Sequence, residues 1–175
     1  GSNTAVGRLS LFDNTTGSFN TGLGVEALTN NTTGAKNVAV GFNALKTNTT
    51  ACCNTAIGFC ALQDSTTAAS NVAVGFASLQ NNTTGGSQVA IGCNALGANT
   101  TGYHNTSLGY NALGNLQTGY NNIAIGHNSG TDAMANFSSS ETNKIALGNN
   151  SSDTAYIKID WTVTSDLRDK TNIGT

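Results

Sequence analysis

The sequence has no proline and few charged residues, which make up 9% of the chain, while glycine occurs 21 times in 175 residues. Asparagine and threonine supply much of the polarity. Ordinary globular domains carry about 25% charged residues, and disordered segments that are kept open by charge carry a high net charge. The composition therefore argues against both classes.

A basic surface is also missing, because the net charge is −2 and the isoelectric point is near 5.4. We therefore expect no nucleic-acid partner. No apolar run is long enough to span a bilayer, and we expect no membrane insertion. No Ser-His-Asp set, carboxylate pair or phosphate-binding loop is visible, so we expect neither an enzyme that acts on an external substrate nor a cofactor.

Four cysteines are present, and their spacing fits no metal-ligand pattern. They are Cys52, Cys53, Cys60 and Cys93. A disulfide between the two adjacent cysteines would be strained. We expect all four to be small buried side chains or free thiols.

The chain is built from a 17-residue repeat. Segment 37–45, Asn-Val-Ala-Val-Gly-Phe-Asn-Ala-Leu, recurs in close copies along most of the sequence. Its glycine recurs as Gly7, Gly24, Gly41, Gly58, Gly75, Gly92, Gly109 and Gly126. Its leucine recurs as Leu11, Leu28, Leu45, Leu62, Leu79, Leu96 and Leu113. A spacing that is kept at two positions of each unit indicates a repeat architecture.

We number each unit from its leading asparagine, so that Asn37 is position 1 and Gly41 is position 5. Positions 1 to 5 have the pattern Asn-x-Ala-h-Gly, in which h is Val, Leu or Ile, and predict a β-strand. Position 2 is Thr, Val or Ile, so bulky side chains point to one side of the strand and Ala or Gly to the other. A face with so few side chain atoms permits close approach of another backbone, and we expect it to pack near an axis.

Positions 6 to 9 form a second apolar segment, and a tail of Asn-Thr-Thr-Gly type, such as 31–34, closes the unit with turn-forming residues. We predict two short strands and two turns per unit. This is one coil of an all-β, parallel β-solenoid with about eight 17-residue coils. Stacked coils place equivalent Asn and Thr side chains in ladders. Since each coil has only a few large apolar side chains to offset the entropy of ordering its backbone, we expect several chains to share a core.

The Asn-x-Ala-h-Gly pattern resembles the repeat in the head domains of trimeric autotransporter adhesins, from Asn3 to about Gly126. The resemblance implies a left-handed parallel β-roll over residues 3–130 and an intertwined homotrimer. The 17-residue unit is longer than the usual adhesin coil, which implies a wider turn. His127 takes position 6, and three copies of it could hold a metal or an anion if that position faced the three-fold axis. We expect both His127 and His104 to serve packing or the surface instead, with no metal site.

After Gly126 the interval lengthens, because the next Ile-Ala-Leu-Gly ends at Gly148 and not at the position that the repeat requires. We predict a polar loop or cap over 131–142 and a half-buried strand over 155–163, where apolar and polar residues alternate. Trp161, the single tryptophan, is expected to anchor the base of the trimer. Residues 131–164 are thus assigned to a cap loop and a C-terminal strand region.

The last stretch, Ser-Asp-Leu-Arg-Asp-Lys-Thr-Asn-Ile at 165–173, resembles the opening of the endosialidase-type intramolecular chaperone of phage tail spikes and fibres. The resemblance implies that residues 165–175 begin such a domain and that the precursor cleaves itself between Ser165 and Asp166. It also implies that Ser165 is the nucleophile and Lys170 its partner. Asp169 replaces the apolar residue usual in that family and would favour the charged form of Lys170, whereas the amine must be neutral to act as a base. The alternative is a polar terminus with a chance similarity.

These patterns predict a structural or receptor-binding segment of a trimeric viral tail fibre or spike, located in the virion and attaching to a host cell-surface receptor such as a glycan. The alternative is the head of a cellular trimeric adhesin at the cell surface. An ice-binding solenoid is a third candidate, suggested by stacked pairs such as Thr32 and Thr33. Adjacent Thr residues in a strand point to opposite faces, however, and do not form the flat array that such a surface needs.

Overall fold

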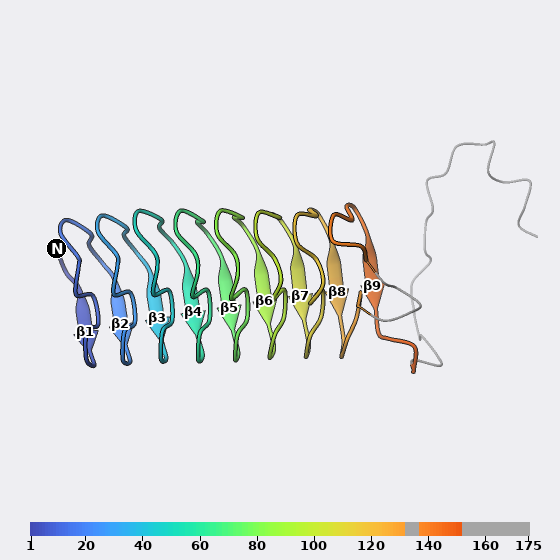
Figure 1. Cartoon of the computed structure of the whole chain (residues 1–175), viewed down its shortest axis with the longest axis horizontal. Coiled ribbons are helices and arrows are strands. Elements are labelled where there is room, and N and C mark those ends of the chain that lie inside the picture. The colour runs from blue at the N-terminus through green and yellow to red at the C-terminus, as the bar shows by residue number, and fades with distance from the viewer. Residues whose placement is uncertain (132–136, 152–175) are drawn as a thin grey trace, which may run out of the picture.

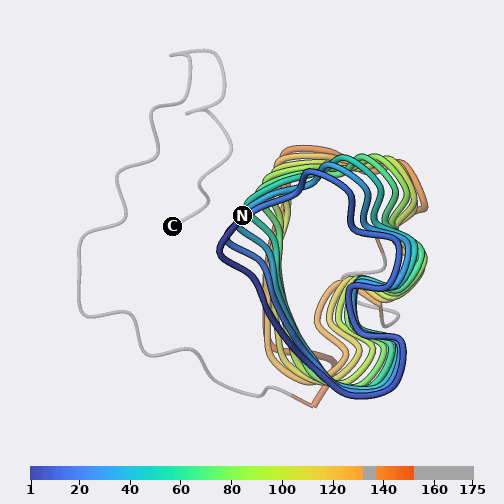
Figure 2. The same ribbon diagram turned by 90° about the vertical axis from the view of Figure 1, so that its left-hand side faces the viewer.

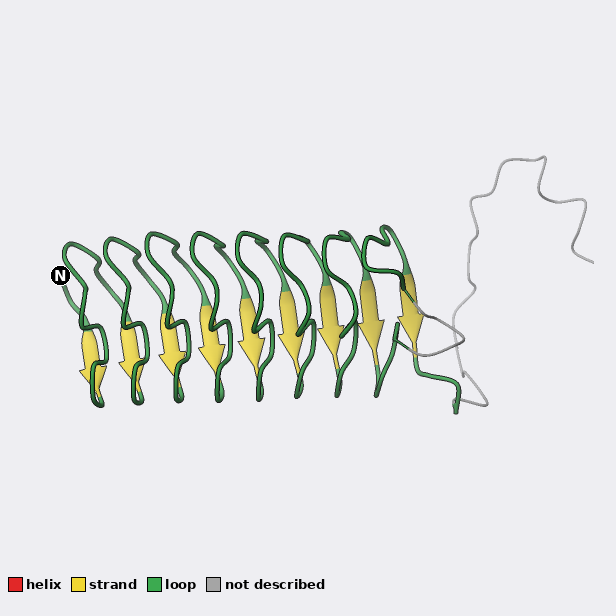
Figure 3. Ribbon diagram, in the orientation of Figure 1, coloured by secondary structure: helices red, strands yellow, loops and turns green. Residues whose placement is uncertain are grey.

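The computed structural model describes residues 1–131 and 137–151. Within them the chain winds into a rod in which one short strand per coil lies beside the strand of the next coil (Figure 1 and Figure 3). No helix is present in these described ranges. The strands are β1 (Thr4–Val6), β2 (Thr21–Leu23), β3 (Val38–Val40), β4 (Thr55–Ile57), β5 (Val72–Val74), β6 (Val89–Ile91), β7 (Thr106–Leu108), β8 (Ile123–Ile125) and β9 (Ile145–Leu147).

All nine strands of the described residues form one parallel sheet in sequence order. The register advances by one repeat unit at each step from β1 to β8, as in the pair of Ala39 and Ala56. The step from β8 to β9 is longer, and there Ala124 pairs with Ala146. The prediction of an all-β parallel β-solenoid is therefore confirmed. It has about seven coils of the repeat length, because eight equivalent glycines enclose seven intervals.

Viewed along its axis, the rod has one outline that every coil repeats, with an inward fold on one side (Figure 2). The glycine at position 5 is required for this close stacking. Gly41 has a φ of 136°, which L-residues rarely adopt, and a Cβ atom at this position would overlap with the carbonyl oxygen of Gly58 in the next coil. A side chain here would therefore force the two coils apart.

The prediction of a second strand in each coil is wrong. Positions 7 and 9 have left-handed backbone conformations, with φ values of 56° at Asn43 and 50° at Leu45. Equivalent residues in the other coils have similar values. Because left-handed residues interrupt an extended chain, this segment folds inward as a turn. The inward fold buries the leucine at position 9.

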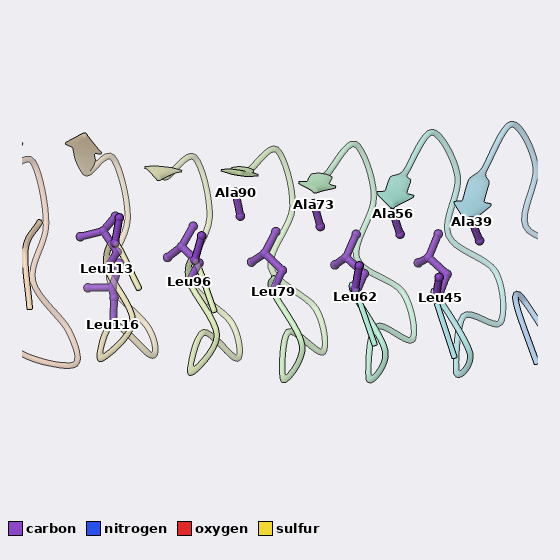
Figure 4. Packing of buried hydrophobic residues seen from close by; sticks show 14 of the residues in the cluster. Ala39, Leu45, Ala56, Leu62, Ala73, Leu79, Ala90, Leu96, Leu113 and Leu116 are labelled. Atoms are coloured by element: carbon purple, nitrogen blue, oxygen red, sulfur yellow. The ribbon is translucent and has the colours of Figure 1, made fainter. Parts of the chain in front are cut away.

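The alanines of the strands face the inside of their own coils, which overturns the expectation that the Ala face packs near an external axis. Ala39 and Leu45 are both fully buried. Figure 4 shows the strand alanines pointing toward the row of leucines from the opposite wall. A coil this short is too narrow for a leucine to meet a second bulky side chain, so the strand contributes only a methyl group. The bulky residues at positions 2 and 4 consequently point outward.

Two ladders of buried asparagines run along the interior and supply hydrogen bonds to most of its polar groups, as the repeat predicts. At position 1 the Asn37 backbone N–H donates to Oδ1 of Asn20 at 3.0 Å, and its Nδ2 donates to the Ala51 carbonyl at 2.9 Å. At position 12 the Asn48 Nδ2 donates to Oδ1 of Asn31 at 2.7 Å. These bonds connect each coil to its neighbour and bind the tail to the strand.

The longer interval before β9 contains a residue that replaces the missing core leucine of the coil of β8. Gly130 stands where earlier coils have leucine, and the buried Phe137 joins the core instead. The Phe137 N–H donates to the Gly130 carbonyl at 2.9 Å. A buried residue within the predicted loop of 131–142 is thus part of the solenoid core. The predicted strand 155–163, Trp161, and the domain limits at 164 and 165 lie outside the described residues.

Candidate functional site

The largest exposed apolar surface of the described residues is the outward side of the sheet, which we call the outer strand face. It consists of positions 2, 4 and 6 of each coil. Its exposed large apolar members are Val6, Leu23, Phe42, Ile57, Phe59, Phe76, Ile91, Leu108, Tyr110, Ile123, Ile125, Ile145 and Leu147. Outside this face, the exposed large apolar side chains of the described residues are Phe12, Phe19 and Tyr103. The apolar exposure is therefore concentrated on one side of the rod.

Strand geometry explains why this face is exposed. Ala56 at position 3 points into the core, so Thr55 and Ile57 on either side of it point out. Ile57 is 40% exposed and Phe59 is 48% exposed. Because the same alternation holds in every strand, the exposed side chains form continuous columns along the rod.

The aromatic residues at position 6 stack on one another. The Phe42 and Phe59 rings are 5.0 Å apart at 16°, and the Phe59 and Phe76 rings are 5.4 Å apart at 10°. After Cys93, the column resumes with Tyr110 and His127, whose rings are 5.1 Å apart at 12°. Stacking fixes these rings into a rigid strip rather than leaving independent side chains.

Charge is almost absent from the outer strand face. Arg8 is its single charged residue among those described, and its guanidinium pairs with Glu26 at 2.8 Å. Lys46 pairs with the other carboxylate oxygen of Glu26, also at 2.8 Å. Hydrogen bonds from Lys46 and then from Arg8 hold the pKa of Glu26 below its usual value. The one charged residue of the face is thus held in an ion-pair cluster at one end, and the remainder of the face has no Lys, Arg, Asp or Glu.

The outer strand face is long and narrow. Nine strands at about 4.8 Å spacing give a length of about 40 Å, and positions 2 to 6 span roughly 13 Å. The footprint of about 500 Å² includes the threonines at position 2, and it lies within the range of the largest apolar patches on monomeric proteins, which are often functional.

The tail of each coil carries the polar surface. At position 13 the Thr32 hydroxyl donates to the Thr49 carbonyl of the next coil at 2.9 Å, and later coils repeat this bond. At position 14 the threonine is exposed, as for Thr33 and Thr50. The adjacent threonines therefore have different roles, and coils such as those of Thr32-Thr33 and Thr49-Thr50 present one exposed threonine of the pair.

The cysteines are free thiols, as the sequence predicts. Cys60 is buried, and burial raises the pKa of its thiol. A hydrogen bond with Cys53 is the main cause that raises the pKa of Cys52. In the parts of the chain that the structure describes, no three His, Cys, Asp or Glu side chains are grouped so as to hold a metal ion. The described residues also contain no pocket and no helix that could cross a membrane.

The sequence predicts two groups of site residues, the structural residues of the repeat and the self-cleavage residues. In the first group, the glycines stack along one edge of the sheet and the leucines form the inner wall. Leu28, Leu45, Leu62, Leu79, Leu96 and Leu113 are all fully buried. The proposed self-cleavage residues Ser165, Asp166 and Lys170 lie outside the described residues. Sequence reasoning missed the outer strand face, although the constant leucine was a usable signal, since its volume excludes a second bulky residue inside the coil.

Comparison of the chain with models of protein families, with curated proteins and with solved structures found no match.

Proposed function

We propose that this chain is a structural, receptor-binding segment of a trimeric viral tail fibre or spike, and that three copies meet through the outer strand face. The observation that carries the proposal is the uncharged apolar face, which runs the length of the described rod while the core of a single chain is only one Ala and one Leu layer thick. Burial of this face would add the apolar contacts that a single narrow coil lacks.

The partner proposed for this face is another copy of the same chain. The exposed side chains repeat at the coil spacing, and a second solenoid presents chemically identical side chains at the same spacing. Two sheets with complementary surfaces pack face to face about 10 Å apart. Three copies, and the left hand of the coil, are supported by the resemblance of the Asn-x-Ala-h-Gly repeat to adhesin heads that form trimers.

The rod form suits attachment at a distance. The described residues lack a pocket, and a polar tail of similar composition recurs along their surface in most coils. A rigid repeated surface in three copies serves as a spacer or as an avidity surface for a repetitive receptor. The resemblance of 165–173 to a fibre chaperone supports the virion as its location.

A cellular trimeric adhesin is the second candidate, at the cell surface. The same Asn-x-Ala-h-Gly repeat favours it, since the repeat alone is shared by both classes. The segment 165–173 separates the two, because only the viral fibre is expected to continue into the self-cleaving chaperone.

Light scattering coupled to size-exclusion chromatography tests the assembly. We expect a particle of three times the chain mass of 17.7 kDa. Replacement of Ile57 and Phe59 by Asp on the outer strand face should abolish the trimer, because each carboxylate would have to be buried without a partner. Replacement of Thr50 and Thr67 by Asp on the exposed tail is the matched control and should leave the trimer intact. A stable β-rich monomer of the unaltered chain at micromolar concentration would refute the proposal.

A further inference from the structure

A pair of stacked tyrosines stands near the end of its coils, three residues before the outer strand face begins in the next coil. Tyr103 and Tyr120 occupy position 16 of successive coils, and their rings are 4.9 Å apart at 3°. In the earlier coils this position carries small residues. They are Ser18, Ala35, Cys52, Ala69 and Gly86. The aromatic column therefore begins abruptly at Tyr103.

One face of the Tyr103 ring is open because the residue before it in the column is Gly86. The two coils are in direct contact there, since the His104 N–H donates to the Gly86 carbonyl at 3.1 Å. Tyr120 covers one face of Tyr103, and Gly86 has no side chain to cover the other. Tyr103 is 41% exposed. Tyr103 therefore presents a flat aromatic platform toward the preceding coil, in which position 16 has no side chain.

Polar groups surround this platform. The His104 ring lies edge-on to Tyr103, with centroids 5.0 Å apart at 82°. Ser87 follows Gly86 in the chain, Thr101 precedes Tyr103 by two residues, and both are exposed. Among the described residues, neither the Ser87 hydroxyl nor the His104 ring nitrogens have a hydrogen-bond partner. None of Gly86, Ser87, Thr101 and Tyr103 carries a charge.

We propose that the open face of Tyr103, above Gly86, is a binding subsite for a pyranose ring of a neutral glycan. The C–H face of a pyranose is apolar and flat, and it packs on an aromatic face, while its hydroxyl groups need donors and acceptors around the rim. Ser87, Thr101 and His104 supply such groups, and no Lys or Arg is among the residues of this platform to select an acidic sugar. Each chain provides one subsite, so an assembly of three chains provides three and gains avidity on a repetitive glycan. This inference rests on the proposed receptor-binding function and names the class of receptor.

Saturation-transfer NMR on the complete chain tests the subsite, with maltotetraose and chitotetraose as neutral probes and sialyllactose as an acidic probe. We expect transfer to ring protons of at least one neutral probe, and an apparent affinity reduced at least tenfold by Tyr103→Ala. Gly86→Leu should have the same effect, because a bulky aliphatic side chain would cover the open face without presenting a new aromatic ring. Ala35→Leu, at the same position three coils earlier than Gly86, is the matched control and should bind as the unaltered chain does.

Two results would overturn the subsite: no transfer to either neutral probe, or transfer that survives both Tyr103→Ala and Gly86→Leu. A preference for sialyllactose would also overturn it, because the site has no Lys or Arg to select a carboxylate. Light scattering on the same samples keeps the two proposals separate. A trimer without glycan binding refutes only the subsite, and a monomer that binds refutes only the trimeric fibre.

Discussion

Ala56 and Leu62 face each other across the interior of one coil, and both are fully buried (Figure 4). The strand supplies the methyl group and the opposite wall supplies the large side chain. This division leaves the bulky residues of the strand outside, and it makes the leucine the main apolar contribution of each coil to its own core.

The buried leucine should tolerate no charge. Leu62→Asp is expected to destabilise the protein by about 4 kcal/mol or more, because it removes a buried side chain and introduces an unpaired carboxylate. Gln63→Asp, at the next and partly exposed position, should change the stability by about 0.5 kcal/mol or less. Thermal unfolding of both variants checks the prediction. Equal melting temperatures would mean that position 9 does not face the interior.

The left-handed backbone at the same leucine should discriminate between side chains of similar volume. Leu62 has a φ of 50°. A β-branched residue is especially unfavourable in this conformation. Leu62→Ile should therefore destabilise by about 1–2 kcal/mol more than Leu62→Met. Urea unfolding of the two variants measures the difference, and an isoleucine variant as stable as the methionine variant would contradict the turn conformation.

Restoring the position 12 ladder should stabilise the solenoid. Ser65 interrupts this column of asparagines, and both its Oγ and Oδ1 of Asn48 are buried without a hydrogen-bond partner. In Ser65→Asn, the new amide would donate to Asn48 and accept from Asn82. We expect a gain of about 1 kcal/mol in the free energy of unfolding. Thr67→Asn, at an exposed position, is the control for the composition change, and an equal or larger gain in that control would remove the ladder explanation.

A second interruption involves Gln88, the one position 1 residue of the described repeats from Asn3 to Asn122 that is not asparagine. Its longer side chain reaches across to the other ladder, where Nε2 donates to Oδ1 of Asn82 at 3.2 Å and of Asn99 at 3.1 Å. The Nδ2 of Asn99 is left without a partner. Gln88→Asn should let both ladders continue and stabilise by about 1 kcal/mol. Unchanged denaturant midpoints would show that the glutamine arrangement is already as favourable.

Maturation of the complete gene product tests the viral assignment. If the chain continues into the chaperone, expression should yield a fibre that ends at Ser165 and a released fragment that begins at Asp166. Ser165→Ala or Lys170→Ala should leave the chain uncut but still trimeric, because assembly precedes cleavage in the family that the segment resembles. Mass spectrometry decides the outcome. An intact unaltered chain, or a cut elsewhere, would favour the cellular adhesin.

The sequence alone determined the repeat, because a 17-residue spacing kept at both Gly41 and Leu45 admits few architectures, and the strand within positions 1 to 5 follows from the local pattern. It also determined the ladders, since equivalent residues of stacked coils must lie over one another. The tertiary structure decided which side of each strand is inside. Alternation in a strand separates Ala39 from Val38 and Val40 but does not say which face is buried; that depends on the width of the coil and on the volume already taken by Leu45. The structure also decided that positions 6 to 9 form a turn, because the left-handed conformation of a leucine has no local sequence signal and persists only where burial of its side chain compensates.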